Sequence, residues 1–360
     1  MNKKKICFIA QFPPPMHGLS KAVEILYNSE LQDEFEIEKI DITNNKKIFK
    51  NLKLISKSQA ELFYFTISQT KYGNIRDLII LKFLELQHKK CLIHLHGGYY
   101  RKLVENDMSS WQRRANYKAI SKLSGAIVLG KSLKYIFEGM LPDDKIFIVP
   151  NCVDDEYLMC ELEFEEKIRL LPEKKVKHVL YLSNFIRSKG YMEVLELAKF
   201  EKERCSAENR KLHFDFAGKF FKATEKKIFF NYIKKNNLED YVTYHGIVNG
   251  DKKRELLKNC DIYTLFTRYP NEGQPISILE AMGNGLMIFT TDYAGIPDIV
   301  DNGINGIMIK VDGINIHNLY ETIKDLGPVT DLLRNAYRKI RQEFLEKTYL
   351  DNMRKIFRYL

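Results

Sequence analysis

The segment between residues 261 and 282 constrains the fold more than any other part of the chain. Residues 261–266 are apolar enough to form a buried strand, and Pro275 suits the first position of a helix, where a missing N–H group costs nothing. Glu272 falls on the turn between these elements, and Glu280 lies inside the helix. Such a turn can bind anions, because free N–H groups and the helix dipole face it. A carboxylate beside an anion is tolerated if it binds hydroxyl groups, so the segment suits a nucleotide that carries a sugar.

Two carboxylates at this spacing can also be unrelated, one on a loop and the other on the face of a helix. Their surroundings, however, form three ordered blocks: Glu272-Gly-Gln-Pro with Glu280-Ala-Met-Gly-Asn-Gly, then residues 290–300, then Asn302-Gly-Ile-Asn-Gly. These blocks resemble the retaining glycosyltransferases of family 4, part of the glycosyl transferases group 1, of the type that builds bacterial surface polysaccharides. The family has the GT-B fold.

The resemblance implies an α/β protein with two doubly wound, Rossmann-like domains that face each other across a cleft. A C-terminal helix is expected to cross back to the first domain. At 360 residues the chain is long enough for two domains. We expect an acceptor-side domain over residues 1–165 together with a helix at about 346–360, and a domain that binds the nucleotide sugar over residues 166–345.

The resemblance also assigns roles in the second domain. Glu280 is expected to hold the two ribose hydroxyls, and Glu272 to accept hydrogen bonds from the donor sugar as a catalytic residue. Whether Glu272 is also a nucleophile, as in retaining glycosidases, stays open. The residues after Glu272 are expected to bind the donor diphosphate through their N–H groups; these are Gly273, Gln274, Pro275 and Ile276.

A second donor loop is expected over residues 183–190, directly after an apolar strand. Lys189, with the glycine that follows it, matches the family pattern, and its ammonium group suits a catalytic role at the diphosphate. The family usually has Gly and Arg where this chain has Ser183 and Asn184. We therefore expect Arg187 to supply the missing charge, with Asn184 still in the donor site.

In the first domain, a strand from residue 91 ends in His94-Leu-His96-Gly-Gly. Because side chains alternate along a strand, the two histidines point to the same side. His94 suits a buried position held by a hydrogen bond as well as it suits a ligand. His96 lies at the carboxyl end of the strand, where open α/β sheets bind ligands. Related enzymes often have a His-Gly there that approaches the donor sugar, so we expect His96 to be a catalytic residue. Gly18, in the first loop, is expected to face the donor diphosphate.

Basic residues are concentrated in one window. Residues 45–134 contain 18 Lys and Arg against 5 Asp and Glu, a net charge of +13. This window can be an ordinary solvated surface, but it also suits an anionic membrane. No motif for nucleic acid accompanies it, so we expect no nucleic-acid partner. The expected acceptor or membrane face consists of Tyr99, Tyr100 and Arg101, together with Lys46, Lys47, Lys50 and Lys53, which flank apolar residues in a predicted helix over Lys46–Ser58.

We expect a cytoplasmic enzyme that works at the inner face of the membrane. Only five apolar residues follow the first lysines, and no apolar run is long enough to span a bilayer.

No Asp-x-Asp motif occurs in a suitable loop, so we expect neither an essential metal nor a cofactor. The expected partners are a UDP-linked sugar donor and a lipid-linked or glycan acceptor. Two alternatives are a sugar-nucleotide epimerase with the same fold and a glycosyltransferase-like subunit that has lost its chemistry.

Overall fold

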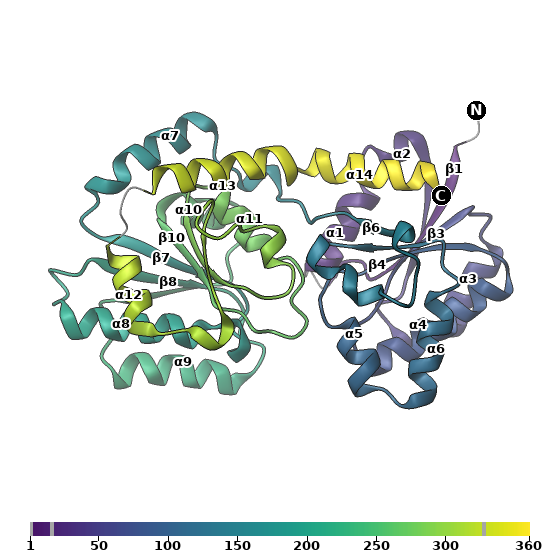
Figure 1. Cartoon of the computed structure of the whole chain (residues 1–360), viewed down its shortest axis with the longest axis horizontal. Helices are drawn as coiled ribbons and strands as arrows, with labels where there is room; N and C mark the ends of the chain where they lie inside the picture. Colours follow the sequence, from purple (N-terminus) through teal and green to yellow (C-terminus); the bar gives the residue numbers. More distant parts are fainter. Residues whose placement is uncertain (1–2, 15–17, 326–328) are drawn as a thin grey trace. The chain divides into compact units, whose positions relative to one another are not determined.

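The computed structural model describes residues 3–14, 18–325 and 329–360. The chain divides into two compact units, Met1–Asn151 with Lys347–Leu360, and Cys152–Glu346 (Figure 1). The sequence-based boundary after residue 165 lies inside helix α7 (Glu161–Leu170), whose Phe164 and Ile168 pack in the core of the second unit. Each unit has its own sheet and is described separately.

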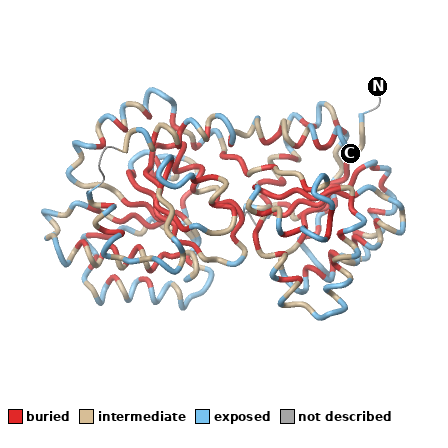
Figure 2. The backbone as a smooth tube through the Cα atoms, viewed as in Figure 1, coloured by how far each residue is buried: buried red, intermediate tan, exposed pale blue. Residues whose placement is uncertain are grey.

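The sheet of the first unit has six parallel strands in the order β2-β1-β3-β4-β5-β6. The strands are β1 (Lys4–Ala10), β2 (Phe35–Asp41), β3 (Leu62–Thr66), β4 (Lys90–His94), β5 (Gly125–Val128) and β6 (Ile146–Ile148). Continuous apolar runs such as those of β1 and β3 are typical of parallel strands, because helices cover both faces of the sheet. Figure 2 shows the strands as the most buried part of the unit.

Helices cover this sheet on both faces. They are α1 (Gly18–Tyr27), α2 (Leu31–Glu34), α3 (Ile48–Lys57), α4 (Lys71–Leu86), α5 (Tyr100–Lys102), α6 (Ser110–Ile120) and α14 (Glu346–Tyr359). On one face, Ile55 of α3 and Ile80 of α4 pack with Phe63 and Phe65 of β3. Helix α14 is the last element of the chain, and its Phe357 contacts three rings of the first unit. The expected return of the C-terminal helix to the first unit is therefore confirmed.

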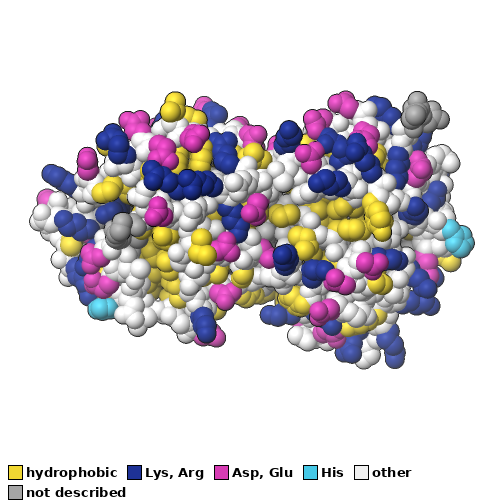
Figure 3. All heavy atoms as spheres, turned by 45° about the horizontal axis from the view of Figure 1, so that its top comes forward, with side chains coloured by type: hydrophobic (Ala, Val, Ile, Leu, Met, Phe, Trp, Pro, Cys, Tyr) yellow, Lys and Arg dark blue, Asp and Glu magenta, His cyan; other side chains and the backbone are white. Residues whose placement is uncertain are grey.

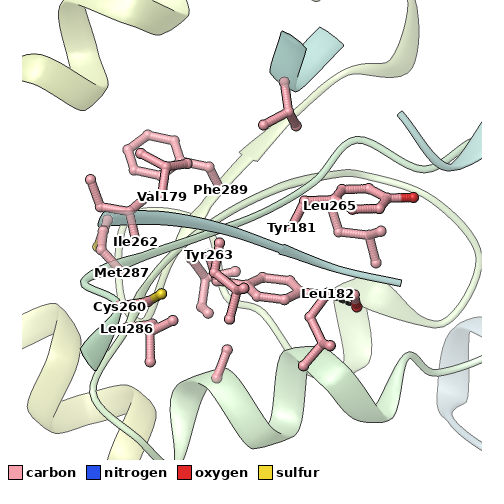
Figure 4. Packing of buried hydrophobic residues seen from close by; sticks show 14 of the residues in the cluster. Val179, Tyr181, Leu182, Cys260, Ile262, Tyr263, Leu265, Leu286, Met287 and Phe289 are labelled. Carbon is pink, nitrogen blue, oxygen red and sulfur yellow. Dashed lines mark hydrogen bonds between the residues drawn. The ribbon is translucent and has the colours of Figure 1, made fainter. Parts of the chain in front are cut away.

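The second unit repeats this architecture with the strand order β12-β11-β10-β7-β8-β9. The strands are β7 (Lys177–Leu182), β8 (Leu212–Ala217), β9 (Val242–Gly246), β10 (Ile262–Leu265), β11 (Met287–Thr291) and β12 (Ile307–Ile309). The helices are α7, α8 (Tyr191–Arg204), α9 (Ala223–Lys235), α10 (Gly250–Asn259), α11 (Ile276–Met282), α12 (Ile316–Lys324) and α13 (Thr330–Glu343). Figure 4 shows how Val179, Ile262 and Phe289, from three adjacent strands, pack together, while the Tyr263 ring extends from the opposite face of the sheet. Two doubly wound α/β units, as expected from the sequence, are thus present.

The surface is mixed in charge where Figure 3 shows it, with Lys and Arg interspersed among Asp and Glu. Among the helices that the structure describes, none combines the length and the apolar character needed to cross a bilayer.

Candidate active site

The two predicted donor loops meet in the second unit. Strands β7 and β10 are neighbours, although β8 and β9 lie between them in sequence, so the strand order reverses here. Open α/β sheets bind ligands beyond the carboxyl ends of the strands at such a reversal. Residues 183–190 follow β7, and residues 266–275 follow β10. The topology alone therefore brings both loops to one edge of the sheet.

Glycine is required where these loops touch. Gly190 has a φ of +81°, and a Cβ atom there would lie 2.5 Å from the carbonyl oxygen of Phe266. The main-chain N–H of Arg268 also donates to the oxygen of Ser188 at 2.7 Å. Only a residue without a side chain fits this approach. The contact fixes the position of Lys189 relative to the loop after β10.

Glu272 and Lys189 are brought together by this packing. Glu272 is 7% exposed, and its Oε2 lies 3.2 Å from Nζ of Lys189. The same oxygen accepts a hydrogen bond of 2.9 Å from the hydroxyl of Thr267. A carboxylate removed from water needs such partners. The site thus holds an anionic and a cationic group side by side at the end of the sheet.

Glu280 lies on α11, which begins at Ile276, directly after Pro275. Its carboxylate is almost fully buried, and Oε1 accepts a hydrogen bond of 2.6 Å from Nζ of Lys253 on α10. The Lys253 ammonium also lies 4.2 Å from the centre of the Tyr157 ring. Lys253 was not predicted from the sequence, because no motif marks it. It is the second cation of the site.

Arg187 and Asn184 have other contacts. The Arg187 side chain forms a hydrogen bond with the hydroxyl of Tyr191, which in turn donates to Glu225. The carbonyl oxygen of Asn184 accepts hydrogen bonds from the Tyr181 hydroxyl at 3.0 Å and from a main-chain N–H at 2.9 Å. These contacts hold the loop in shape. The expected roles of both residues toward the donor stay predictions.

The donor loop after β10 continues with Gly273, Gln274 and Pro275. Gln274 is 4% exposed, and the oxygen of Gly273 accepts a hydrogen bond of 3.0 Å from the N–H of Gly295. The segment that follows β11 therefore also holds this loop in position.

Arg268 of the same loop is a cation that the sequence did not predict at the site, and it is bound to Glu193 at 2.7 Å.

Unpaired polar groups gather at the carboxyl ends of β3 and β4 in the first unit. His94 is fully buried, with its Nδ1 at 2.8 Å from the Tyr64 hydroxyl, and its ring lies 3.9 Å from that of His96. Nε2 of both histidines and Oγ1 of Thr66 are buried without a hydrogen-bond partner among the described residues. Buried polar atoms normally have partners, so a ligand with hydroxyl groups would complete this cluster.

Burial keeps the two histidines neutral. It lowers the pKa of His96 to about 4, although a hydrogen bond with Asn151 acts in the opposite direction, and it lowers the pKa of His94 well below the usual value. A neutral imidazole has one donor and one acceptor nitrogen, so His96 suits hydrogen bonding to a sugar hydroxyl.

We expect the ring carbon signals of His96 to stay unchanged in NMR spectra between about pH 5.5 and 8, whereas a free histidine titrates near 6.5. The unfolded chain binds this proton more readily than the folded one, so His96 should lower the stability as the pH falls from about 6.5 towards 4. A His96→Gln variant should lose that part of the pH dependence. A midpoint for His96 near 6.5 would contradict the neutral assignment.

The predicted acceptor face is only partly at the surface. Tyr100 is 2% exposed, and its hydroxyl donates to Asn116 at 2.7 Å. The prediction that Tyr100 is part of the acceptor or membrane face is therefore wrong, because the residue belongs to the core of the first unit. The half-buried Tyr99 donates to Asp107 at 2.7 Å, and Arg101 donates to the oxygen of Glu138 at 2.6 Å.

Gly18 is the first residue of α1, and a Cβ atom there would meet nothing within 4 Å. Its role at the diphosphate stays a prediction. Residues 15–17 of the same predicted loop lie outside the described residues.

Comparisons with known proteins agree with this architecture. The family model for glycosyl transferases group 1 matches residues 163–342, half of the chain. An uncharacterized glycosyltransferase of Methanocaldococcus jannaschii, MJ1069, is 27% identical over 232 residues, 62% of this chain and 56% of its own length. A second one, MJ1607, is 25% identical over 221 residues, 59% of this chain and 52% of its own length. The match thus spans about half the length of each.

Among solved structures, HepE of Anabaena in complex with UDP and glucose has a TM-score of 0.73 at 15% identity, covering 99% of this chain and all of its own. This likeness extends over both units and shows that they form the expected GT-B fold. The family match covers the whole segment that contains the Lys189–Glu272 and Lys253–Glu280 pairs. The chain belongs to the family of glycosyl transferases group 1.

Proposed function

We propose that the protein is a retaining glycosyltransferase of family 4 that transfers a sugar from a UDP-linked donor to a lipid-linked or saccharide acceptor in cell-surface polysaccharide synthesis. The observation that carries this proposal is the pair of buried carboxylates, Glu272 and Glu280, which lie in the loop and the helix that follow β10 and are each bound to an ammonium group. UDP and glucose in the structure of Anabaena HepE support the choice of donor.

The chemistry follows from the charges of the site. Lys189 has three N–H donors, so it can keep its contact with Glu272 and still bind the diphosphate. As the bond from the anomeric carbon to the diphosphate breaks, negative charge grows on the leaving oxygen, and a fixed ammonium group lowers the barrier. In the front-side route that we favour, the acceptor oxygen bonds to the same face of the anomeric carbon, and its proton goes to the diphosphate.

Replacing Glu280 with Gln is expected to weaken the binding of free UDP about tenfold or more. The change keeps the volume but removes the charge that accepts hydrogen bonds from ribose, and a hydrogen bond to a charged group contributes about 1.5–3 kcal/mol. Calorimetric titration with UDP measures the effect, with the exposed Glu239→Gln as the control. Equal affinities of the E280Q variant and the parent protein would reject the ribose assignment.

The experiment that tests the proposed function is a panel of nucleotide sugars. Binding is measured as a thermal shift, since a ligand at 100 times its Kd adds about 2.7 kcal/mol of stability. Turnover is then followed as release of UDP, with and without EDTA, because we propose that no metal or cofactor takes part. A UDP-sugar that is converted to its epimer without any acceptor would support the alternative enzyme. Binding of no nucleotide sugar would support a subunit without chemistry.

We further propose that the protein works at the cytoplasmic face of a membrane that contains anionic lipid. Lys46, Lys47, Lys50 and Lys53 are exposed at the start of α3 and just before it. This helix packs in the first unit through Ile55, but Phe49 is 84% exposed between the lysines. Apolar residues flanked by lysines are typical of surfaces that bind anionic lipid.

Changing these four lysines to Gln is expected to release the protein from vesicles with anionic lipid. Each basic residue near such a surface contributes about 1 kcal/mol. Co-sedimentation measures binding, while donor hydrolysis in solution should be unchanged. Four exposed lysines of α9, changed in the same way, form the matched control: Lys226, Lys227, Lys234 and Lys235. Equal loss in both variants would show a non-specific effect of charge.

A further inference from the structure

Helix α4 has a second apolar stripe on the side that faces away from the sheet. Ile80 and Leu84 are buried against the sheet of the first unit. On the outer side, Ile75, Ile79 and Leu86 are 39%, 44% and 65% exposed. A surface helix normally carries polar residues there, and a helix that is apolar on both sides is normally covered on both.

The outer stripe forms the floor of a groove of about 350 Å³. Leu52 of α3 lines it on one side, and Trp111 and Ala115 of α6 line it on the other. Trp111 is the single tryptophan of the sequence and is 58% exposed. Exposed apolar surfaces of this kind mark sites at which a protein meets a partner or a membrane.

The three helices that line the groove also carry cations, and Lys82 is part of its lining. Exposed basic residues occur on all three helices, and they are Lys50, Lys53 and Lys57 on α3, Lys82 on α4, and Arg113, Arg114 and Lys118 on α6. Glu85 of α4 is bound to Lys82 at 2.9 Å. The asymmetry holds for the chain as a whole: residues 45–134 carry a net charge of +13, whereas the remaining 39 basic and 42 acidic residues carry −3.

We propose that this groove, with Trp111 at its edge, enters the boundary between headgroups and hydrocarbon in an anionic bilayer. The inference rests on the proposed membrane-bound function and names the surface that penetrates. An apolar groove on helices that also carry exposed cations matches the hydrocarbon and the anionic headgroups of such a bilayer, and tryptophan prefers the boundary between them. A second copy of the chain would place the same cations against these, which is unfavourable. The bilayer is therefore the occupant that the charges favour.

Trp111 provides the measurement. With the full chain and vesicles of phosphatidylglycerol and phosphatidylcholine, its emission is expected to shift to shorter wavelength and to be quenched by lipids brominated in the acyl chains. Vesicles of phosphatidylcholine alone should leave it unchanged.

Changing both Ile79 and Leu86 to Ser should raise the lipid concentration for half-maximal binding about tenfold or more, because less apolar area is then removed from water on binding. The control is the double change of Leu162 and Ile228, exposed in the second unit, to Ser.

The outcomes separate this inference from the proposed function. Co-sedimentation with anionic vesicles without any change in Trp111 emission would overturn the groove and leave docking by the α3 lysines standing. An equal shift with both kinds of vesicle would overturn the role of the cations. A shift that depends on protein concentration without lipid would identify a second copy of the chain as the occupant. Turnover of the UDP-sugar in solution tests the catalytic proposal independently of all three.

Discussion

Replacing Glu272 with Gln is expected to lower kcat/KM for sugar transfer by about 100- to 1000-fold. Among the described residues, the Glu272 carboxylate is the acidic group bound to Lys189, and the Thr267 hydroxyl donates to the same oxygen. The variant keeps the shape of the side chain but loses the charge that accepts hydrogen bonds from the sugar. Loss of one fixed electrostatic partner of a transition state typically costs two to three orders of magnitude. Initial rates at varied donor concentration measure the effect.

Two further measurements make this result specific. The affinity for free UDP should change little, because Glu272 is proposed to contact the sugar and Glu280 the ribose. The exposed Glu255→Gln, on α10 of the same unit, is the matched control and should leave the rate unchanged. A Glu272→Gln variant with at least half of the parent rate would exclude a role of Glu272 in the transition state. The proposed role of Lys189, which is bound to Glu272, would then need a new explanation.

The sequence predicts the architecture because each strand leaves a local signal. A short apolar run that ends in glycine or polar residues, followed by a helical pattern, recurs along both units and identifies βα repeats. The position of the site follows too. The loops that contain Lys189 and Glu272 come directly after strands β7 and β10, and adjacent parallel strands end at the same edge of a sheet.

Other features depend on contacts that no local pattern reveals. Lys253 reaches Glu280 across 27 positions of sequence, from a helix whose composition is that of an ordinary charged surface. Tyr100 stands between Tyr99 and two basic residues, which favoured an acceptor or membrane face. The Asn116 amide oxygen, however, accepts a hydrogen bond from its hydroxyl and lets the ring enter the core. The sequence does not predict the exposed apolar side of α4, because the residues of its buried and exposed sides form one continuous apolar run.

Replacing Phe357 with Ala is expected to destabilise the first unit by about 3–5 kcal/mol, the usual range for removing a buried phenylalanine. Phe357 is fully buried, and its ring centre lies 6.0 Å from that of Phe8, 5.7 Å from that of Phe35 and 6.0 Å from that of Tyr64. The helix that carries it has other buried side chains, among them Met353 and Ile356, and an ion pair between Arg358 and Glu34, but Phe357 contacts three aromatic rings. The cavity would therefore weaken the attachment of α14 to the sheet.

Urea unfolding can assign this loss to one unit, because the single tryptophan lies in the first. Trp111 emission reports on the unit that Phe357 stabilises, whereas far-UV circular dichroism reports on both units. The transition seen by Trp111 is expected to move to lower urea, while a second transition, which belongs to the other unit, stays in place. Lys355→Ala, an exposed change in the same helix, should alter the stability by less than about 0.5 kcal/mol. If Phe357→Ala had an equally small effect, its ring would not be an anchor of the helix, and the attachment of α14 would have to be assigned to its other buried residues and its surface ion pairs.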